Sequence, residues 1–186
     1  MEVIFIRHTS VDVPPGVCYG QSDVPLRDSF EQEAAVTSEN LESYRPEGRA
    51  FDHVYTSLSR CVRLATYCGY PEAERDNRIM EINFGDWEMK KFDEITDPRL
   101  QEWYADYMNV RATNGESFAM QYQRVADFLD ELKEKDYEKV AVFAHGGVLI
   151  CAQLYAGTIK PEEAFSALTP YGGIVRLKLE HRGTEF

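Results

Sequence analysis

Basic residues are scarce in this chain relative to acidic ones. Its 186 residues include 20 Lys and Arg against 32 Asp and Glu, which gives a formal net charge of −12 at pH 7. Such a balance opposes binding to nucleic acid and to anionic membrane surfaces, so neither is expected as a partner. A small anionic substrate would need a local basic pocket.

Long hydrophobic runs are also missing. The apolar run VIFI at residues 3–6 is only four residues long and ends at the charged Arg7. This run does not resemble a signal peptide, and no stretch approaches the length that a membrane crossing requires. The sequence therefore predicts a cytoplasmic protein.

Paired cysteines are lacking as well. The four cysteines are far apart and form no CxxC motif, so neither a disulfide framework nor a structural zinc site is indicated: Cys18, Cys61, Cys68 and Cys151. We expect reduced thiols that act as small buried hydrophobic side chains.

Internal repeats, low-complexity segments and linkers do not occur either, so a single domain over residues 1–186 is predicted. With 44% hydrophobic and 12% aromatic residues, the chain can build a substantial core. Short apolar runs alternate with helical stretches, which is typical of a mostly parallel sheet covered on both faces. We therefore predict an α/β fold, a three-layer α/β/α sandwich.

The individual elements follow from residue type and periodicity. Segments rich in Val, Ile, Phe and Tyr are predicted as strands, at residues 2–6, 53–56, 140–144 and 174–179. A helix is predicted over residues 117–135, where apolar residues at spacings of three and four form one stripe: Phe118, Tyr122, Val125, Leu129 and Leu132. His53 and His181 are expected in structural or solvated roles.

Residues 86–115 contain many aromatic residues among charges and no strand pattern. This segment predicts a small helical cap inserted into the fold. Two alternatives stay open for its aromatic side chains. Trp87, Trp103 and Tyr104 either stack on an aromatic substrate or form a small core of the cap itself.

Basic and imidazole side chains lie where three predicted strands end. Arg7 and His8 follow the first strand, Arg60 lies three residues after Ser57 at the end of the second, and His145 precedes two glycines after the third. A single such residue is commonly structural. However, ligands in open parallel sheets bind beyond the carboxyl ends of the strands, so this combination indicates a site.

Two arginines and two histidines suit the chemistry of a phosphoryl group. Guanidinium groups match phosphate oxygens and offset their charge in the transition state. A neutral, oriented imidazole can attack phosphorus and form a phosphohistidine. Glu81, which follows an apolar pair, is the predicted proton donor to the leaving oxygen, with Glu116 and Asp86 as alternatives.

Five dispersed motifs resemble those of the histidine phosphatase superfamily, which includes cofactor-dependent phosphoglycerate mutase. They are RH at 7–8, YTSLSRCVRLAT at 55–66, MEINFGDWE at 80–88, NGES at 114–117 and HGG at 145–147, and the resemblance extends from Val3 to about Ala152. Within the superfamily, RHTSVDVPPGVCYGQSDVPL at 7–26 resembles the α-ribazole phosphatases. These remove the 5′-phosphate from α-ribazole phosphate in assembly of the cobalamin nucleotide loop.

The resemblance implies a role for each site residue. His8 would be the phosphorylated nucleophile, and Glu81 would be the general acid that later activates water. Arg7, Arg60 and His145 would hold the phosphoryl oxygens. It also implies a phosphomonoesterase that needs no metal and no organic cofactor, with α-ribazole 5′-phosphate as the favoured small-molecule substrate.

The chain departs from the RHGxTxxN pattern of many members, because Thr9 replaces the glycine and Pro14 stands where an asparagine often contacts phosphate. Another donor must serve there. The candidates are Thr9, Gln21 and backbone N–H groups near Gly146.

Other functions stay open at this point. The enzyme alternatives are a broad-specificity phosphatase and a phosphoglycerate mutase-like enzyme, and a rival view makes His8, His145, Asp86 and Glu81 the ligands of a metallohydrolase. That view lacks a short HxH, HxxxH or DxD motif. A phospho-ligand binding module would need neither nucleophile nor acid. The sequence leaves both a monomer and a homodimer open.

Overall fold

A computed structural model describes residues 1–45, 47 and 50–180, so His181 lies outside the described residues. Its centre is a five-stranded sheet of order β3-β2-β4-β1-β5. The strands are β1 Glu2–Arg7, β2 His53–Thr56, β3 Glu74–Arg75, β4 Lys139–Ala144 and β5 Ile174–Lys178. The helices are α1 Phe30–Glu42, α2 Ser59–Tyr67, α3 Arg99–Ala105, α4 Phe118–Leu132 and α5 Gly146–Tyr155.

The two central strands, β1 and β4, pair in parallel from Glu2 opposite Lys139 to Arg7 opposite Ala144. Their apolar residues have no solvent exposure on either face, as expected for parallel strands inside an α/β protein. β2 and β3 continue the parallel arrangement on one side. β5 closes the other side of the sheet in the antiparallel direction.

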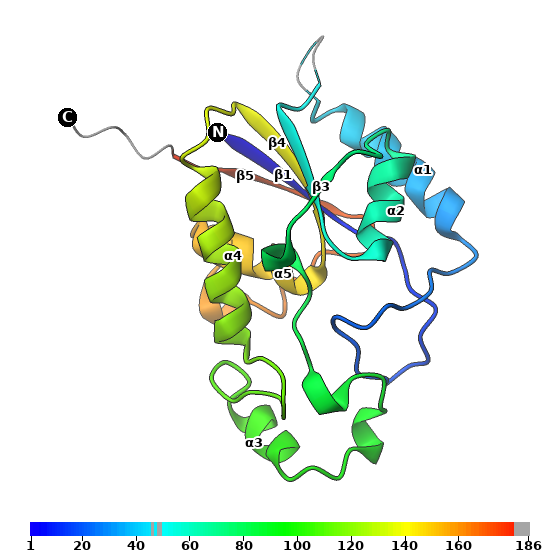
Figure 1. Cartoon of the computed structure of the whole chain (residues 1–186), viewed down its shortest axis with the longest axis vertical. Helices are drawn as coiled ribbons and strands as arrows, with labels where there is room; N and C mark the ends of the chain where they lie inside the picture. Colours follow the sequence, from blue (N-terminus) through cyan, green and yellow to red (C-terminus); the bar gives the residue numbers. More distant parts are fainter. Residues whose placement is uncertain (46, 48–49, 181–186) are drawn as a thin grey trace, which may run out of the picture.

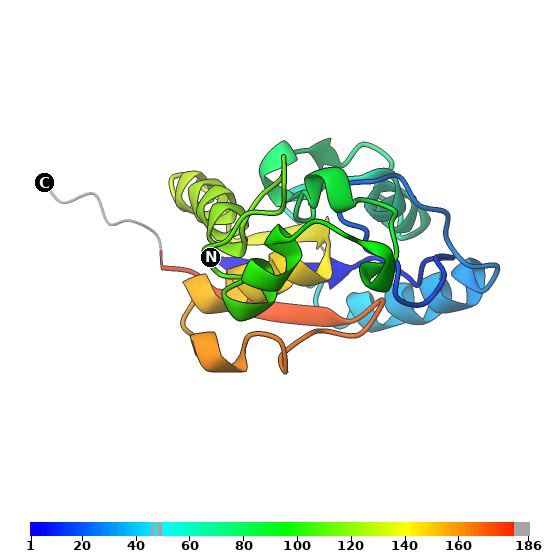
Figure 2. The ribbon, with the colours of Figure 1, turned by 90° about the horizontal axis from the view of Figure 1, so that it is seen from below.

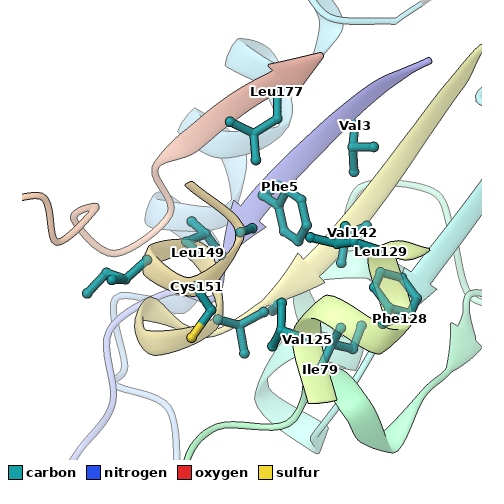
Figure 3. Packing of buried hydrophobic residues seen from close by; sticks show 14 of the residues in the cluster. Val3, Phe5, Ile79, Val125, Phe128, Leu129, Val142, Leu149, Cys151 and Leu177 are labelled. Carbon is teal, nitrogen blue, oxygen red and sulfur yellow. The ribbon is translucent and has the colours of Figure 1, made fainter. Parts of the chain in front are cut away.

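Alternating residues of the central strands belong to two separate cores. On one face, Val3, Phe5 and Val142 pack against α4 and α5, as the labelled side chains of Figure 3 show. On the other face, Ile4 and Phe143 pack against α1 and α2. The predicted three-layer α/β/α sandwich with a mostly parallel sheet is therefore confirmed.

The predicted strands agree with β1, β2, β4 and β5 to within a residue at each end. The predicted helix at 117–135 is shorter in the structure, because α4 ends at Leu132; it begins after Ser117, whose side chain accepts a hydrogen bond from the backbone N–H of Met120. The sequence did not predict β3. All four cysteines are buried and unpaired, as expected.

The cap predicted near 86–115 is present as short helices, with two 3₁₀ turns at Gly85–Trp87 and Phe92–Glu94 before α3. The cap has its own small core of buried residues, namely Cys18, Trp87, Leu100 and Ala112. Cys18 belongs to the loop that follows β1, and a bridge between Val17 and Lys91 also joins this loop to the cap.

The cap lies at the end of the molecule toward which β1 runs (Figure 1), and in Figure 2 it lies in front of the sheet and α5. The carboxyl ends of the parallel strands therefore face the cap. None of the helices in the described part of the chain has both the length and the apolar character that a membrane crossing requires.

Candidate active site

His8 follows the last residue of β1 and is almost fully buried. Its Nδ1 lies 2.7 Å from the carbonyl oxygen of Thr9. A carbonyl oxygen can only accept, so Nδ1 carries the proton and the lone pair of the neutral ring is on Nε2. Burial, together with the positive charges of Arg60 and Arg7, lowers the pKa of His8 to about 3 although the bond to Thr9 opposes this. His8 is thus an uncharged imidazole with a fixed tautomer.

Arg7 is held by a turn between α5 and β5. Its Nη1 donates to the carbonyl oxygen of Thr169 at 2.7 Å, and its guanidinium lies 4.0 Å from the centre of the Tyr171 ring. The same turn binds the backbone, because the N–H of Gly172 donates to the His8 carbonyl and the Arg7 N–H donates to the carbonyl of Gly173. Residues 169–173 therefore fix Arg7 and His8 together.

Arg60 lies in the first turn of α2 and is 1% exposed. Its guanidinium donates to the backbone carbonyls of Gly20 and Ser22. Glu88 holds this loop in turn, since its carboxylate accepts hydrogen bonds from the N–H groups of Gly20 and Gln21 at 2.9 and 2.8 Å. The last residue of the MEINFGDWE motif thus orients the loop that orients Arg60.

His145 precedes α5 and has no solvent exposure. Its Nε2 lies 3.2 Å from the hydroxyl of Ser57, and its ring lies 5.3 Å from that of His8 in an edge-on arrangement. Burial is the main cause that lowers the pKa of His145 well below its usual range, with Arg60 and His8 contributing. A second neutral imidazole therefore stands beside the first.

Glu81 brings a carboxylate to the same place from the loop between β3 and the cap. Its Oε1 accepts hydrogen bonds from the N–H of Ile82 at 2.9 Å and from Nε2 of Gln121 at 2.7 Å. Its Oε2 accepts from the N–H of Gly147, at the N-terminus of α5, at 3.2 Å. The helix start predicted to offer backbone donors does so, but to Glu81.

Neither alternative acid is in a position to replace Glu81. Glu116 forms a two-point ion pair with Arg124, at 2.8 and 3.0 Å, and Arg124 also donates to the backbone carbonyl of Glu81 at 2.9 Å. This ion pair therefore holds the backbone of the segment that carries Glu81. The Asp86 side chain is exposed and accepts a hydrogen bond from Asn114.

Three buried donors around His8 have no hydrogen-bond partner in the described part of the chain. They are Nε of Arg7, Oγ1 of Thr9 and Nε of Arg60. Unpaired buried polar atoms are rare in folded proteins, and each calls for an explanation such as a ligand. The Arg7 guanidinium beside a neutral imidazole fits an anion and lines the cavity described next, whereas Arg60 and Thr9 are buried and do not line it. The charges of Arg7 and Arg60 both act on His8 and make its surroundings basic in an otherwise acidic chain.

A cavity of about 320 Å³ opens beside this group. Arg7, His8, Glu81, Gln121 and Gly146 line its polar side. Its other wall is apolar and largely aromatic, with contributions from the cap and from two loops: Val17, Ile82, Phe84, Phe92, Trp103, Tyr107, Phe118, Phe165 and Leu168. The cavity therefore has a polar side, formed by candidate site residues, and an apolar side, which we call the apolar chamber.

The three residues considered as replacements for the asparagine are placed differently. Gly146 lines the cavity, whereas Thr9 is fully buried and does not line it. Gln21 does not line the cavity; its backbone N–H is bound by Glu88. Pro14 is exposed. Tyr19, from the same loop, does line the cavity, and its ring lies 5.6 Å from the Arg60 guanidinium.

Of the cap aromatics, only Trp103 lines the cavity among the three that the sequence singled out. Trp87 is buried in the core of the cap, where its indole N–H donates to Asp97 at 3.0 Å, and Tyr104 is largely exposed. The four proposed metal ligands do not gather either, because Asp86 lies outside the cavity. The described residues contain no group of three His, Cys, Asp or Glu arranged to hold a metal ion.

Comparison with known proteins now settles the family. The model of the histidine phosphatase superfamily (branch 1) matches residues 3–186. This chain belongs to that superfamily. The predicted resemblance is confirmed, and the buried His8 lies in the RH motif that first indicated it.

Among curated relatives, this histidine phosphatase is 36% identical over 75 residues to the adenosylcobalamin/alpha-ribazole phosphatase of Escherichia coli K12. That stretch covers 38% of this chain and 37% of the relative, so the match spans little more than a third of either protein. Phosphoserine phosphatase 1 of Hydrogenobacter thermophilus is 25% identical over 150 residues, which cover 76% of this chain and 69% of the relative.

Solved structures share the fold of this histidine phosphatase. The alpha-ribazole phosphatase from Shigella flexneri superposes with a TM-score of 0.81 at 22% identity, over 97% of this chain and 96% of that chain. The mycobacterial glucosyl-3-phosphoglycerate phosphatase superposes with a TM-score of 0.76 at 20% identity, over 94% of this chain and 88% of that chain.

The sequence did not predict three polar residues of the site, namely Tyr19, Gln121 and Tyr171. Gln121 is 1% exposed although it carries an amide, and it lies three residues after Phe118 and four before Val125, on the apolar side of α4. A polar residue at such a position was the available sign. The hydroxyl oxygens of Tyr19 and Tyr171 lie 3.0 Å apart, although the two residues are separated by 152 positions in the sequence. No local sequence pattern reveals such a contact.

Proposed function

We propose that this histidine phosphatase is a phosphomonoesterase that works through a phosphohistidine at Nε2 of His8. The carrying observation is the neutral His8 ring, whose Nδ1 proton is bound to Thr9 and whose Nε2 lone pair is left for attack. The unpaired Nε of Arg7, which lines the cavity, and the charge of Arg60 close to His8 support an anionic phosphoryl group as its target.

The reaction takes two displacements. In the first, Nε2 of His8 forms a bond to phosphorus while the bond to the ester oxygen breaks, and Glu81 donates a proton to that oxygen. In the second, the Glu81 carboxylate takes a proton from water as the water oxygen attacks phosphorus. The bond from phosphorus to Nε2 breaks and releases inorganic phosphate.

The basic groups stabilise both displacements. Arg7 and Arg60 offset the negative charge on the phosphoryl oxygens, and they are held in advance by carbonyl groups, so little reorganisation is needed. His145 is neutral and would offer a hydrogen bond to a phosphoryl oxygen from one ring nitrogen. Chelators are expected to leave the activity intact, and recovery by an added divalent ion after chelation would support a metallohydrolase instead.

α-Ribazole 5′-phosphate is the substrate that we favour, in assembly of the cobalamin nucleotide loop. Its dimethylbenzimidazole group would occupy the apolar chamber lined by Phe84, Phe92 and Trp103. The name of the Escherichia coli relative supports this choice. Phosphoserine, the substrate named for another relative, would bring an ammonium and a carboxylate to a cavity in which Arg7 and Glu81 are the charged residues among the described lining.

The partner of the protein in this proposal is a small phosphomonoester. The test is kcat/KM measured for α-ribazole phosphate, phosphoserine, 3-phosphoglycerate and a sugar phosphate. We expect α-ribazole phosphate to lead the panel by about 10²-fold, since buried apolar contacts favour it and unpaired charges disfavour the others. Similar values for all four esters would support a broad-specificity phosphatase, and phosphate transfer between hydroxyls of 3-phosphoglycerate would support a mutase.

A further inference from the structure

A buried amide faces the proposed acid. Gln121 lies in the first turn of α4, and its side chain is 1% exposed. Its Nε2 lies 2.7 Å from Oε1 of Glu81, one of the shortest contacts of that carboxylate. The mechanism above does not use Gln121.

The two oxygens of Glu81 are occupied unequally. Oε1 accepts from the Ile82 N–H at 2.9 Å and from Gln121 at 2.7 Å, so both of its lone pairs are engaged. In the described part of the chain, the one donor to Oε2 is the Gly147 N–H, at 3.2 Å. One lone pair therefore stays available on Oε2 and none on Oε1.

Close packing keeps this arrangement in place. A Cβ atom at Gly147 would lie 2.4 Å from Oε1 of Glu81 and 2.9 Å from Nε2 of Gln121, so no other residue fits there without moving both. The carboxylate and the amide thus rest directly on the start of α5.

Other charged groups near Glu81 do not orient its oxygens. Arg124 binds the backbone carbonyl of Glu81 and the carboxylate of Glu116, so its guanidinium is engaged by these groups and not by the Glu81 carboxylate. The thiols of Cys61 and Cys151 also lie within electrostatic range of Glu81, and burial raises the pKa of each, so both are uncharged. Within the described residues, Gln121 is the one side chain that donates to the carboxylate.

We infer that Gln121 is a positioning residue that occupies Oε1 of Glu81 and thereby reserves Oε2 for the proton exchanged with the ester oxygen and with water. This inference rests on the proposed function, because it concerns the acid of that reaction. Without the amide, either oxygen can carry the proton, and the carboxyl group loses the contact that fixes its rotation about the side-chain axis.

The test is the dependence of kcat/KM on the leaving group. This constant reports the steps up to formation of the phosphoenzyme, where Glu81 acts as the acid. A basic alkoxide needs the proton, whereas 2,4-dinitrophenolate departs readily as an anion. The experiment compares an alkyl phosphate with 2,4-dinitrophenyl phosphate in wild type, Gln121→Met and Gln123→Met. Gln123 is an exposed glutamine on the same helix that binds Asp127, so it is the matched control.

We expect Gln121→Met to lower kcat/KM for the alkyl ester about tenfold, the size of a lost hydrogen bond to a charged group. Its activity on the dinitrophenyl ester should be retained, which also demonstrates that the variant is folded. Gln123→Met should match wild type on both. Equal losses on the two esters, or no loss on either, would overturn the role of Gln121. If wild type itself cleaves neither ester, the proposed function fails instead.

Discussion

The two sides of the active-site cavity are built from different interactions. On the phosphoryl side, functional side chains are bound to backbone carbonyls: His8 to Thr9, Arg7 to Thr169, and Arg60 to Gly20 and Ser22. On the cap side, ring contacts dominate. Trp103 alone lies within 6.4 Å, between ring centres, of five other aromatic side chains: Phe84, Trp87, Phe92, Tyr104 and Tyr107.

This difference determines which side of the cavity tolerates amino-acid substitution. A hydrogen bond to a carbonyl sets both distance and direction, and substitution elsewhere leaves the carbonyl in place. Contacts between rings tolerate replacement by side chains of similar volume. The residues of the cap side can therefore change without disturbing the hydrogen bonds of the other side.

The largest effect should come from the phosphoryl side, by His8→Ala. If Nε2 forms the phosphoenzyme, this change removes the reaction path, and turnover should fall at least about 10³-fold while the protein stays folded. Wild type mixed rapidly with a labelled ester should show a phosphoenzyme that is acid-labile and base-stable. A His8→Ala enzyme with full activity would refute the mechanism.

The next largest effects should distinguish the proton transfer proposed for Glu81 from the charge stabilisation proposed for Arg60. Arg60→Ala should lower kcat about 10²–10³-fold on α-ribazole phosphate and on p-nitrophenyl phosphate alike, since both esters develop the same phosphoryl charge. Glu81→Gln should lose about 10²-fold or more on the first ester and far less on the second. Equal losses in Glu81→Gln would remove Glu81 from the acid role.

On the cap side, Trp103→Leu should act on binding rather than on chemistry. We expect KM for α-ribazole phosphate to rise about tenfold, because an aromatic contact and buried area are lost. The kcat value should hold, and glycerol phosphate, which has no ring to place in the chamber, should be unaffected. Val36→Ala, on the far surface, is the control. A loss of kcat on both esters would show that the cap also shapes the phosphoryl side.

The last prediction concerns stability instead of turnover, and it too belongs to the phosphoryl side. In the folded protein the pKa values of His8 and His145 are lowered, that of His8 to about 3, while the unfolded chain has values near ~6.5. The unfolded state therefore binds more protons below about pH 6.5. The free energy of unfolding should be highest above that pH and fall by up to about 1.4 kcal/mol per pH unit for each histidine on acidification.

Urea unfolding at pH 7, 6, 5 and 4 measures this slope. His8→Asn should reduce it, whereas His53→Asn keeps both buried histidines and the slope that they cause. An identical slope in wild type and His8→Asn would contradict the assignment of His8 as a neutral buried group.

The polar candidates of the site could be chosen from the sequence because strand ends are visible in it. Arg7, His8 and His145 each follow an apolar run, and parallel strands bring such ends together. β3 was not predicted, since Glu74 and Arg75 are polar and exposed and form a strand only through their pairing with Tyr55 and Thr56.

Contacts between distant segments could not be predicted at all. The bond from Arg7 to Thr169 joins residues 162 positions apart, and that from Gln121 to Glu81 joins residues 40 apart. Pairings of this kind depend on how loops and helix ends meet after packing, and one sequence contains no periodicity that records them. The sequence likewise left open which aromatic residues line the cavity. In the structure, Trp103 lines it and Trp87 lies in the core of the cap.

The position of β1 between β4 and β5 has a consequence for the order in which the molecule is made. Arg7 precedes Thr169, whose carbonyl oxygen binds its guanidinium, by 162 residues, and the same turn binds the backbone of His8. At ribosomal rates of roughly 5–20 residues per second, roughly 10–30 s separate the synthesis of the two segments. Arg7 and His8 therefore lack the turn that fixes them during all of that time, and they reach their final surroundings only when residues 169–173 dock.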